Sequence, residues 1–247
     1  MEHLGEQLDI HTGGIDHIPV HHTNEIAQSE AITGKKPFVR FWVHHNFLLI
    51  EGQKMSKSLE NIYTVDDLLK KDYDPMAFRL LLLGAHYRSE MNFTWKNLEG
   101  AQVSWERLQD KVQQFLASKD QDPEPTEAQA ATEQQYRQRF FQQLENDLHT
   151  PEGLAIMWEM VGDSELTTEQ RYNTLLSFDE VLGLGLARIE PTEELEIPRE
   201  VQRLLDQRQA ARAAENWEEA DSLRQQINAL GYQVIDTDGD QQQVKKL

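Results

Sequence analysis

The sequence of 247 residues contains no cysteine. It therefore has neither a disulfide framework nor a thiolate ligand for a metal ion. It also has no apolar run approaching the roughly 20 residues that cross a bilayer. Its first residues show neither the basic cluster nor the apolar stretch of a signal peptide. These absences predict a cytoplasmic protein that does not enter a membrane.

Basic residues are also scarce. The chain has 24 lysines and arginines against 43 aspartates and glutamates, for a formal net charge of −19. Residues 101–247 hold 29 of the 43 acidic side chains. Because lysine and arginine hold phosphate-rich partners, this balance argues against non-specific nucleic-acid binding. It leaves room for a local basic face on an acidic body.

The first part of the chain alternates strand and helix patterns. Residues 7–14 predict a short strand that runs into a glycine turn, where ligands sit in open α/β sheets. A helix is expected from Glu25 to Ala31, with Thr23 as its N-cap and Gly34 beyond its end. The aromatic and β-branched residues from Phe38 to Ile50 predict another strand, and residues 51–60 a polar loop.

Helical patterns dominate further on. Thr64 and Asp67 form a capping-box-like start, and Asp74-Pro75 opens the next helix. Further helices are expected at 95–118, 131–147, 151–162 (with Thr150 as N-cap), 167–183, 199–214 and 216–230, and a strand at 232–236. Polar, proline-bearing stretches at 119–130 and 190–198 mark linkers. The pattern indicates an α/β remnant, a helical bundle and a small terminal module.

The segment most informative about chemistry is Lys54, Met55, Ser56, Lys57 and Ser58. Lysine is a flexible point charge, so two lysines with two hydroxyl residues in one loop suit a triphosphate that moves during reaction. Activation of a carboxylate by ATP needs positioning and charge stabilisation rather than a protein nucleophile. The alternative is a solvated loop with incidental lysines.

This K-M-S-K-S segment resembles the ATP-handling loop of class I aminoacyl-tRNA synthetases, and its surroundings resemble those of cysteinyl-tRNA synthetases. The matching segments are D-I-H-T-G-G-I-D at 9–16, H-H-T-N-E-I-A-Q-S at 21–29, F-W-V-H at 41–44, H-Y-R-S at 86–89, D-L-H-T-P at 147–151, and the pattern of Arg208, Arg212, Trp217, Ala220, Asp221 and Arg224. The resemblance covers nearly the whole chain apart from the tail and the linkers.

The resemblance implies an α/β remnant of a Rossmann-like class I catalytic domain, then a mostly α-helical bundle and a small C-terminal α+β module. The expected bounds are 1–50 for the C-terminal part of the catalytic domain, 51–92 for the K-M-S-K-S loop and the connecting stem-contact region, 93–189 for a helical-bundle tRNA-binding domain, 198–240 for an anticodon-binding module, and 241–247 for a disordered tail.

The implied activity is that of a cysteine–tRNA ligase, which activates cysteine with ATP and Mg²⁺ and transfers it to tRNA-Cys. Lys54 and Lys57 are the expected catalytic residues. ATP is expected to bind residues 54–58 together with Gly13, Gly14 and Asp16. Glycine lets the backbone approach a nucleotide, and a carboxylate can accept from ribose hydroxyls. A plain tight turn is the alternative.

His21 and Glu25 lie four residues apart on one face of a helix start, a spacing that suits a shared metal ion. The resemblance implies that they hold zinc with two cysteines from earlier in the family's sequence, and that the zinc captures the substrate thiolate. Without those cysteines the site is expected to be incomplete and to bind zinc weakly. The alternative is a surface pair without a ligand. His11, His17 and His22 are expected to be structural or to line the pocket.

Six residues are candidate tRNA contacts: Arg79, Arg88, Arg208, Arg212, Trp217 and Arg224. Arg79 and Arg88 either face tRNA or close intramolecular ion pairs. The other four could meet a single-stranded anticodon by stacking and phosphate pairing. Trp217 could also anchor the small helical pair, and we favour that interpretation.

The chain lacks H-x-G-H, the second signature of class I synthetases. In the family a zinc-binding cysteine lies shortly before the position of Met1, which therefore resembles an internal methionine. We expect an N-terminally incomplete cysteine–tRNA ligase that is inactive alone: a gene fragment, a split subunit with a separate N-terminal half polypeptide, or a mis-set start. One alternative is a non-catalytic tRNA-binding or regulatory paralogue. Another alternative is a relative that joins cysteine to a sugar amine. The module after residue 198 argues against it, because such a module is expected only in the tRNA enzyme.

Overall fold

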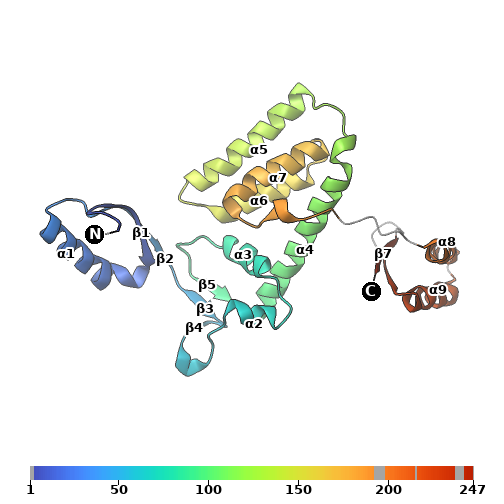
Figure 1. Cartoon of the computed structure of the whole chain (residues 1–247), viewed down its shortest axis with the longest axis horizontal. Coiled ribbons are helices and arrows are strands. Elements are labelled where there is room, and N and C mark those ends of the chain that lie inside the picture. The colour runs from blue at the N-terminus through green and yellow to red at the C-terminus, as the bar shows by residue number, and fades with distance from the viewer. Residues whose placement is uncertain (1–2, 192–197, 215, 237–241, 247) are drawn as a thin grey trace. The chain divides into compact units, whose positions relative to one another are not determined.

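The computed structural model describes residues 3–191, 198–214, 216–236 and 242–246 (Figure 1). The chain divides into two compact units, Met1–Glu190 and Pro191–Leu247, and each has its own hydrophobic core. No helix in the described part of the chain is long and apolar enough to cross a membrane.

The first unit opens with two parallel strands joined by a helix (Figure 1). β1 (Leu8–Gly14) pairs with β2 (Val39–His45), so that Ile10 lies opposite Phe41 and His11 opposite Trp42. The connecting helix, α1 (Thr23–Thr33), ends at Gly34, whose left-handed backbone (φ 67°) favours glycine. The strand–helix–strand pattern predicted from the sequence is confirmed here.

The start of α1 differs from the expectation that Thr23 is its N-cap. A 3-10 turn (Ile15–His17) and a π-helical turn (Ile18–His22) lead directly into the helix. His22 already has helical dihedrals (φ −67°, ψ −34°), and the Thr23 hydroxyl donates to the carbonyl of Ile18 at 2.6 Å. The N-cap prediction is wrong because the continuous helical backbone leaves no free helix start at Thr23.

A second sheet has the strand order β4-β3-β5. β3 (Leu48–Ile50) runs parallel to β5 (Met91–Phe93) and antiparallel to β4 (Gln53–Lys54). The single strand predicted from Phe38 to Ile50 is therefore two strands, and the break lies at Asn46, whose amide donates to the carbonyl of Tyr87 at 2.8 Å. β5 escaped prediction because three residues are too few to show a period of two.

Two short helices lie between β4 and β5 in the chain. α2 (Val65–Leu69) starts with the predicted capping box of Thr64 and Asp67. The amide and hydroxyl of Thr64 lower the pKa of the Asp67 carboxyl to about 2. α3 (Pro75–Leu83) follows Asp74, whose carboxylate accepts the amide of Met76, as the sequence predicted for a helix start.

Four helices build the main core: α4 (Trp95–Ser118), α5 (Glu127–Glu145), α6 (Thr150–Gly162) and α7 (Thr168–Leu182). α4 has the bounds that its apolar periodicity predicted. Phe140 of α5 stacks on Phe178 of α7, with ring centroids 3.9 Å apart and 9° between the planes. Gly153 of α6 permits this packing, because a Cβ there would lie 3.3 Å from the Phe140 ring.

Two helix starts differ from the predictions. Part of the expected linker at 119–130 is a 3-10 turn (Lys119–Gln121) and the first residues of α5. α5 begins early because Thr126 and Gln129 form a capping box. α6 follows His149, so Thr150 is its first residue rather than its N-cap.

The second unit contains α8 (Arg199–Ala213), α9 (Trp217–Ala229) and an antiparallel pair, β6 (Tyr232–Asp236) and β7 (Gln242–Lys246). The expectation of a disordered tail over 241–247 is wrong for β7. Val244 packs against the core of the unit, and Gln242 Nε2 donates to the carbonyl of Leu205 at 2.7 Å. The rest of that tail, residues 241 and 247, and the end of the predicted module at 237–240 lie outside the described residues.

Replacing Phe140 by alanine is expected to lower the free energy of unfolding of the first unit by about 3–5 kcal/mol, because a cavity would open in a close-packed core. Phe41 is 67% exposed, so Phe41→Ala is the matched control and should change stability by about 0.5 kcal/mol or less. Urea unfolding followed by circular dichroism measures both. Equal destabilisation by the two substitutions would contradict the packing described.

Candidate active site

Histidine side chains gather where β1, the π-helical turn and β2 meet. His22 is buried, and its ring centroid lies 4.8 Å from that of His11 and 5.0 Å from that of His44. A hydrogen bond of 2.8 Å joins His22 Nδ1 and His44 Nε2. The rings of His17 and His21 lie 5.2 and 5.5 Å from that of His22. These five residues form the histidine cluster.

Glu25 brings one carboxylate to this cluster. Its Oε2 lies 2.8 Å from His11 Nε2, and its Oε1 lies 3.6 Å from His21 Nε2. The structure therefore brings the predicted pair of His21 and Glu25 together. His11 is nevertheless the nearer partner, and one donor atom each from His11, His22 and Glu25 lie within 4.8 Å of one another. Imidazole and carboxylate are ligands that zinc accepts, so these residues fit the imidazole and carboxylate part of a zinc site.

The buried position of His22 affects its protonation. Burial lowers the pKa of its imidazole below the usual value, and the neighbouring rings of His11 and His44 lower it further. The ring is therefore mostly neutral at pH 7, the form in which a histidine can coordinate a metal ion or accept a hydrogen bond.

Gly13 and Gly14 end β1 where side chains press on its backbone. A Cβ on Gly13 would lie 2.7 Å from His17 Nδ1 and from His22 Cε1, closer than real Cβ atoms approach, and a Cβ on Gly14 would collide with the carboxylate of Asp16. Neither glycine has a positive φ. The predicted strand therefore extends through both glycines, and the chain turns only from Ile15 onward. The glycines allow side chains to approach the strand closely.

The segment Lys54–Ser58 has a fixed base. Asn61 Nδ2 donates to the carbonyl of Lys54 at 3.2 Å, and Asn61 Oδ1 accepts the amide of Ser56 at 2.8 Å. The two serine hydroxyls of the segment lie 3.2 Å apart. One asparagine thus ties both sides of the loop, and it leaves the hydroxyl groups for other partners.

The lysines of this loop lie beside the second sheet. Lys54 ends β4, its side chain is exposed, and its Nζ lies 5.5 Å from the centre of the Phe47 ring. Met55 packs against the main core. Lys57 starts a 3-10 turn (Lys57–Leu59), and its side chain lies outside the described part of the structure. Among the described residues, no hydrogen bond or ion pair joins this loop to the glycines that end β1.

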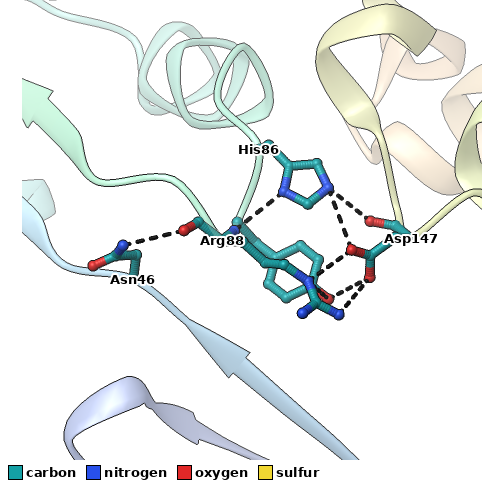
Figure 2. A network of polar contacts seen from close by, with 5 residues as sticks. Asn46, His86, Arg88 and Asp147 are labelled. Carbon is teal, nitrogen blue, oxygen red and sulfur yellow. Dashed lines mark hydrogen bonds and ion pairs between the residues drawn. The ribbon is translucent and has the colours of Figure 1, made fainter.

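Figure 2 shows a polar network between the loop after α3 and the turn that follows α5. The Asp147 carboxylate accepts the Tyr87 hydroxyl at 2.5 Å and lies 2.6 Å from Arg88 Nε. His86 Nε2 lies 2.9 Å from the carbonyl oxygen of Asp147. Asn46 Nδ2 donates to the carbonyl of Arg88 at 3.1 Å. The network therefore ties together three segments that are distant in the sequence.

Asp147 sits in a turn of unusual backbone conformation. Asp147 and Leu148 both have left-handed dihedrals, with φ of 58° and 55°. Aspartate tolerates this region better than leucine does, so the contacts of Asp147 hold a turn that Leu148 disfavours. The Tyr87 hydroxyl, and then the Arg88 guanidinium, lower the pKa of the Asp147 carboxyl.

The two arginines of the first unit that are candidate tRNA contacts both make intramolecular contacts. Arg79 Nε donates to the carbonyl of Leu182 at 2.6 Å, and its guanidinium lies over Gly183, at the C-terminal end of α7, where a positive charge is favourable. Arg88 pairs with Asp147, which is one of the two alternatives expected for it. A contact of either residue with tRNA stays a prediction.

In the second unit the candidate tRNA residues differ in exposure. Arg208 is 2% exposed and its Nη1 donates to Gln242 Oε1 at 2.9 Å, so the prediction of a tRNA contact is wrong for this residue. Trp217 is 58% exposed, so the favoured interpretation as an anchor of the helical pair is also wrong. The Arg212 guanidinium lies 5.9 Å from the Trp217 ring, and Arg224 is exposed. An exposed indole beside Arg212 suits stacking on a base.

Two family models and several curated proteins match this chain. Residues 1–103 match the family model of the class I (C) tRNA synthetase catalytic domain, and residues 195–244 match that of the cysteinyl-tRNA ligase anticodon-binding domain. The chain is 39% identical over 250 residues to the cysteine–tRNA ligase of Caldicellulosiruptor saccharolyticus, covering 96% of this chain and 52% of that protein. The chain is 37% identical over 243 residues to the cysteine–tRNA ligase of Chlamydia abortus. This match covers 96% of this chain and 51% of that protein. The chain belongs to the cysteinyl-tRNA synthetase family.

Solved structures agree with a partial class I synthetase fold. A LeuRS from Agrobacterium radiobacter K84, in a ternary complex with tRNA and LeuAMS, matches 73% of this chain and 26% of its own, with a TM-score of 0.58 at 16% identity. The methionyl-tRNA synthetase of Mycobacterium tuberculosis, in complex with methionyl-adenylate, matches 71% of this chain and 40% of its own, with a TM-score of 0.50 at 18% identity. The chain spans about half the length of the curated cysteine–tRNA ligases that it matches.

Some contacts in this member of the cysteinyl-tRNA synthetase family were not predicted from its sequence. Asn61 stands three residues after K-M-S-K-S and gave no signal besides its polarity. Asp147 was noted only as part of a matching segment, and its partners lie about 60 residues earlier. His11 and His22 were expected to be structural or to line the pocket, yet they share the space around Glu25.

Asp147→Asn keeps the shape of the side chain and its tolerance of the left-handed region, but removes the charge that holds Arg88. We expect faster amide hydrogen exchange over residues 84–90 than in the unmodified chain, because the network anchors that loop. Glu145→Gln is the matched control, since this exposed side chain has no hydrogen-bond partner among the described residues.

The same network has a predicted pH dependence. The pKa of the Asp147 carboxyl is lower in the folded chain than in the unfolded one. Ionised Asp147 therefore contributes its full share to the stability of the folded chain above the unfolded pKa of about 3.9. This contribution is lost as the pH falls through the folded pKa. Unchanged exchange in Asp147→Asn at neutral pH would contradict this role.

Proposed function

We propose that this chain carries the rear part of the active site of a cysteine–tRNA ligase, a cytoplasmic enzyme of protein biosynthesis. Its substrates would be cysteine, ATP with Mg²⁺, and tRNA-Cys. The observation that carries the proposal is the K-M-S-K-S loop, which Asn61 holds at its base while Lys54 and the serine hydroxyls remain accessible. Membership of the cysteinyl-tRNA synthetase family gives the loop its substrate class.

In this proposal Lys54 and Lys57 stabilise the charge that develops when the cysteine carboxylate attacks the α-phosphate of ATP and pyrophosphate leaves. Met55, Ser56 and Ser58 shape the loop and supply hydroxyl groups. Preorganised positive charge of this kind acts on the transition state without a protein nucleophile. The bare backbone at Gly13 and Gly14, with the Asp16 carboxylate beside it, supports a role in binding the nucleoside part of ATP.

The amino-acid side of the site would use zinc. His21 and Glu25 are the residues that the family resemblance assigns to it, and two cysteine ligands would have to come from outside this chain. Zinc binds thiolate in preference to hydroxyl, so it would help to separate cysteine from serine. In this chain the residues available for that role are imidazoles and one carboxylate.

The first sheet supports the need for further polypeptide. Ile10 and Phe41 lie opposite each other in β1 and β2 and are 63% and 67% exposed. Parallel sheets are almost always covered on both faces. We therefore infer that additional strands or helices, from a front-half polypeptide, cover this side in the working enzyme.

The remaining parts would bind tRNA. We assign the catalytic remnant to residues 1–50, the loop and stem-contact region to 51–92, the helical bundle to 93–189 and the anticodon-binding module to 198–240. Within that module, the exposed Trp217 with Arg212 over its ring would stack on a base and pair with phosphate, and the exposed Arg224 offers a further phosphate contact. The acidic balance of the chain favours such a local contact over broad electrostatic attraction.

The proposal is tested by cysteine-dependent ATP–pyrophosphate exchange. The chain alone should show none, and exchange should appear when it is combined with the front half of the Caldicellulosiruptor saccharolyticus enzyme. Lys54→Ala should then reduce the rate by about a hundredfold, because it removes a charge that stabilises the transition state. Lys96→Ala, another exposed lysine of the first unit, is the control and should have little effect.

Exchange by the chain alone would contradict the need for a front half. Absence of exchange in the combined sample, with tRNA-Cys still bound, would instead favour a non-catalytic tRNA-binding function. Equal losses of exchange rate in Lys54→Ala and Lys96→Ala would contradict a catalytic role of Lys54.

A further inference from the structure

A cavity of about 460 Å³ lies in the first unit, between the start of β3, the end of α3, β5 and the turn that follows α5. Small-molecule sites in proteins commonly enclose roughly 300–1,000 Å³ and have a mainly apolar lining with a few polar groups. None of the described residues in this lining belongs to the K-M-S-K-S loop, to the glycines that end β1 or to the histidine cluster. The cavity is therefore separate from the candidate active site. Its large apolar side chains are Phe47, Leu48, Leu82, Leu83, Met91 and Leu148.

Hydrogen bonds join the walls of this cavity to one another. The amide of Asn46 donates to the carbonyl of Tyr87 at 2.8 Å, and the amide of Met91 donates to the carbonyl of Phe47 at 3.0 Å. The Tyr87 hydroxyl donates to the carboxylate of Asp147, which links this wall to the turn after α5 (Figure 2). The cavity is thus formed without a ligand, so that binding would require little further ordering of the chain.

Leu148 is the most unusual residue of the lining. Its φ of 55° lies in the left-handed region, which costs a residue other than glycine about 1–3 kcal/mol. Its side chain nevertheless stays 51% exposed, and that of Leu82, another lining residue, is 39% exposed. Strained residues of this kind concentrate at ligand sites. The fold therefore keeps an apolar side chain at the cavity in a costly conformation, and an apolar ligand would bury it.

The charges around the cavity favour an anion. Although the chain has a net charge of −19, the described residues of the lining include no aspartate or glutamate, but they include Arg79 and two histidines. The Asp147 carboxylate beside the cavity is already paired with Arg88. Arg79 Nε donates to the carbonyl of Leu182, and no carboxylate among the described residues pairs with its guanidinium. A guanidinium forms strong, charge-assisted hydrogen bonds with a carboxylate.

We propose that this cavity binds a small organic acid with an aromatic or branched aliphatic body. The body lies against Leu82, Met91 and Leu148, and the acid group pairs with Arg79. This site does not depend on the ligase activity proposed above, because it uses none of the residues assigned to ATP or cysteine.

The test uses the full 247-residue chain with naphthalene-2-carboxylate as the probe, and it needs no ATP, tRNA or front half. Titration calorimetry and saturation-transfer NMR measure its binding beside that of the neutral amide and of the cationic naphthalene-2-methylamine. We expect one carboxylate per chain, bound about fivefold more tightly than the amide, with the amine the weakest of the three.

Two substitutions separate the apolar contact from the charge. Leu148→Asn should weaken binding of the carboxylate and of the amide by about tenfold, because asparagine tolerates the left-handed backbone but removes the apolar contact. Arg79→Met keeps an apolar stem and should abolish the preference for the carboxylate over the amide. Because Leu148→Asn relieves backbone strain, it keeps the test decisive if Arg79→Met fails to fold, which far-UV circular dichroism checks.

Val103→Asn and Arg107→Met are the matched controls. Both residues are exposed on α4 and lie outside the lining of the cavity, so neither change should alter the affinity more than about twofold. Equal weakening by Leu148→Asn and Val103→Asn would overturn the proposal.

Three further results would also contradict this site. They are the lack of saturable one-to-one binding, equal affinity for the amine and the carboxylate, and release of the carboxylate when the front half of the Caldicellulosiruptor saccharolyticus enzyme is added. The last result would show that polypeptide covers the cavity in place of a small acid. Absence of ATP–pyrophosphate exchange, by contrast, would count against the proposed ligase function and leave this binding unchanged.

Discussion

Two parallel strands with one open side are the constraint on which the rest of the site depends. Parallel strands have apolar side chains on both faces and require both to be covered. The π-helical turn packs on the side of His11 and Trp42, while Ile10 and Phe41 on the other side stay exposed. The histidine cluster, the glycines that end β1 and Glu25 all take their positions from this strand pair. The geometry of the histidine cluster and of the glycines beside it therefore depends on whatever covers the open side of this strand pair.

Each part of the candidate site is held by its own short-range contacts. The histidine rings are held against Gly13, the K-M-S-K-S loop is held by Asn61, and the loop after α3 is held by Asp147. In the described residues these three groups do not bond to one another across the site. This independence explains how one chain can keep the local arrangement of each part while complete chemistry would require the remainder of the family's fold. The apolar core of α4 to α7 provides the rigid support beneath them.

Sequence reasoning succeeded where one element decides its own structure. The apolar stripe of α4 gave its bounds, and Asp74 and Thr64 gave two helix starts, because periodicity and capping are local. It failed where tertiary contacts decide. Short strands such as β5 have no period of their own, and β7 forms because its partner strand pairs with it. Spacing along a helix indicated His21 with Glu25, but the approach of His11 depends on a π-helical turn that leaves no sequence signature.

The central claim is that the open side of the β1–β2 pair is covered by a front-half polypeptide. Amide hydrogen exchange of the chain, with and without the front half of the Caldicellulosiruptor saccharolyticus enzyme, tests it most directly. The account predicts that residues 8–14 and 39–45 gain strong protection in the mixture, while α4 to α7, already covered by their own core, change little. Unchanged exchange in both strands, in a mixture shown to form a complex, would contradict it.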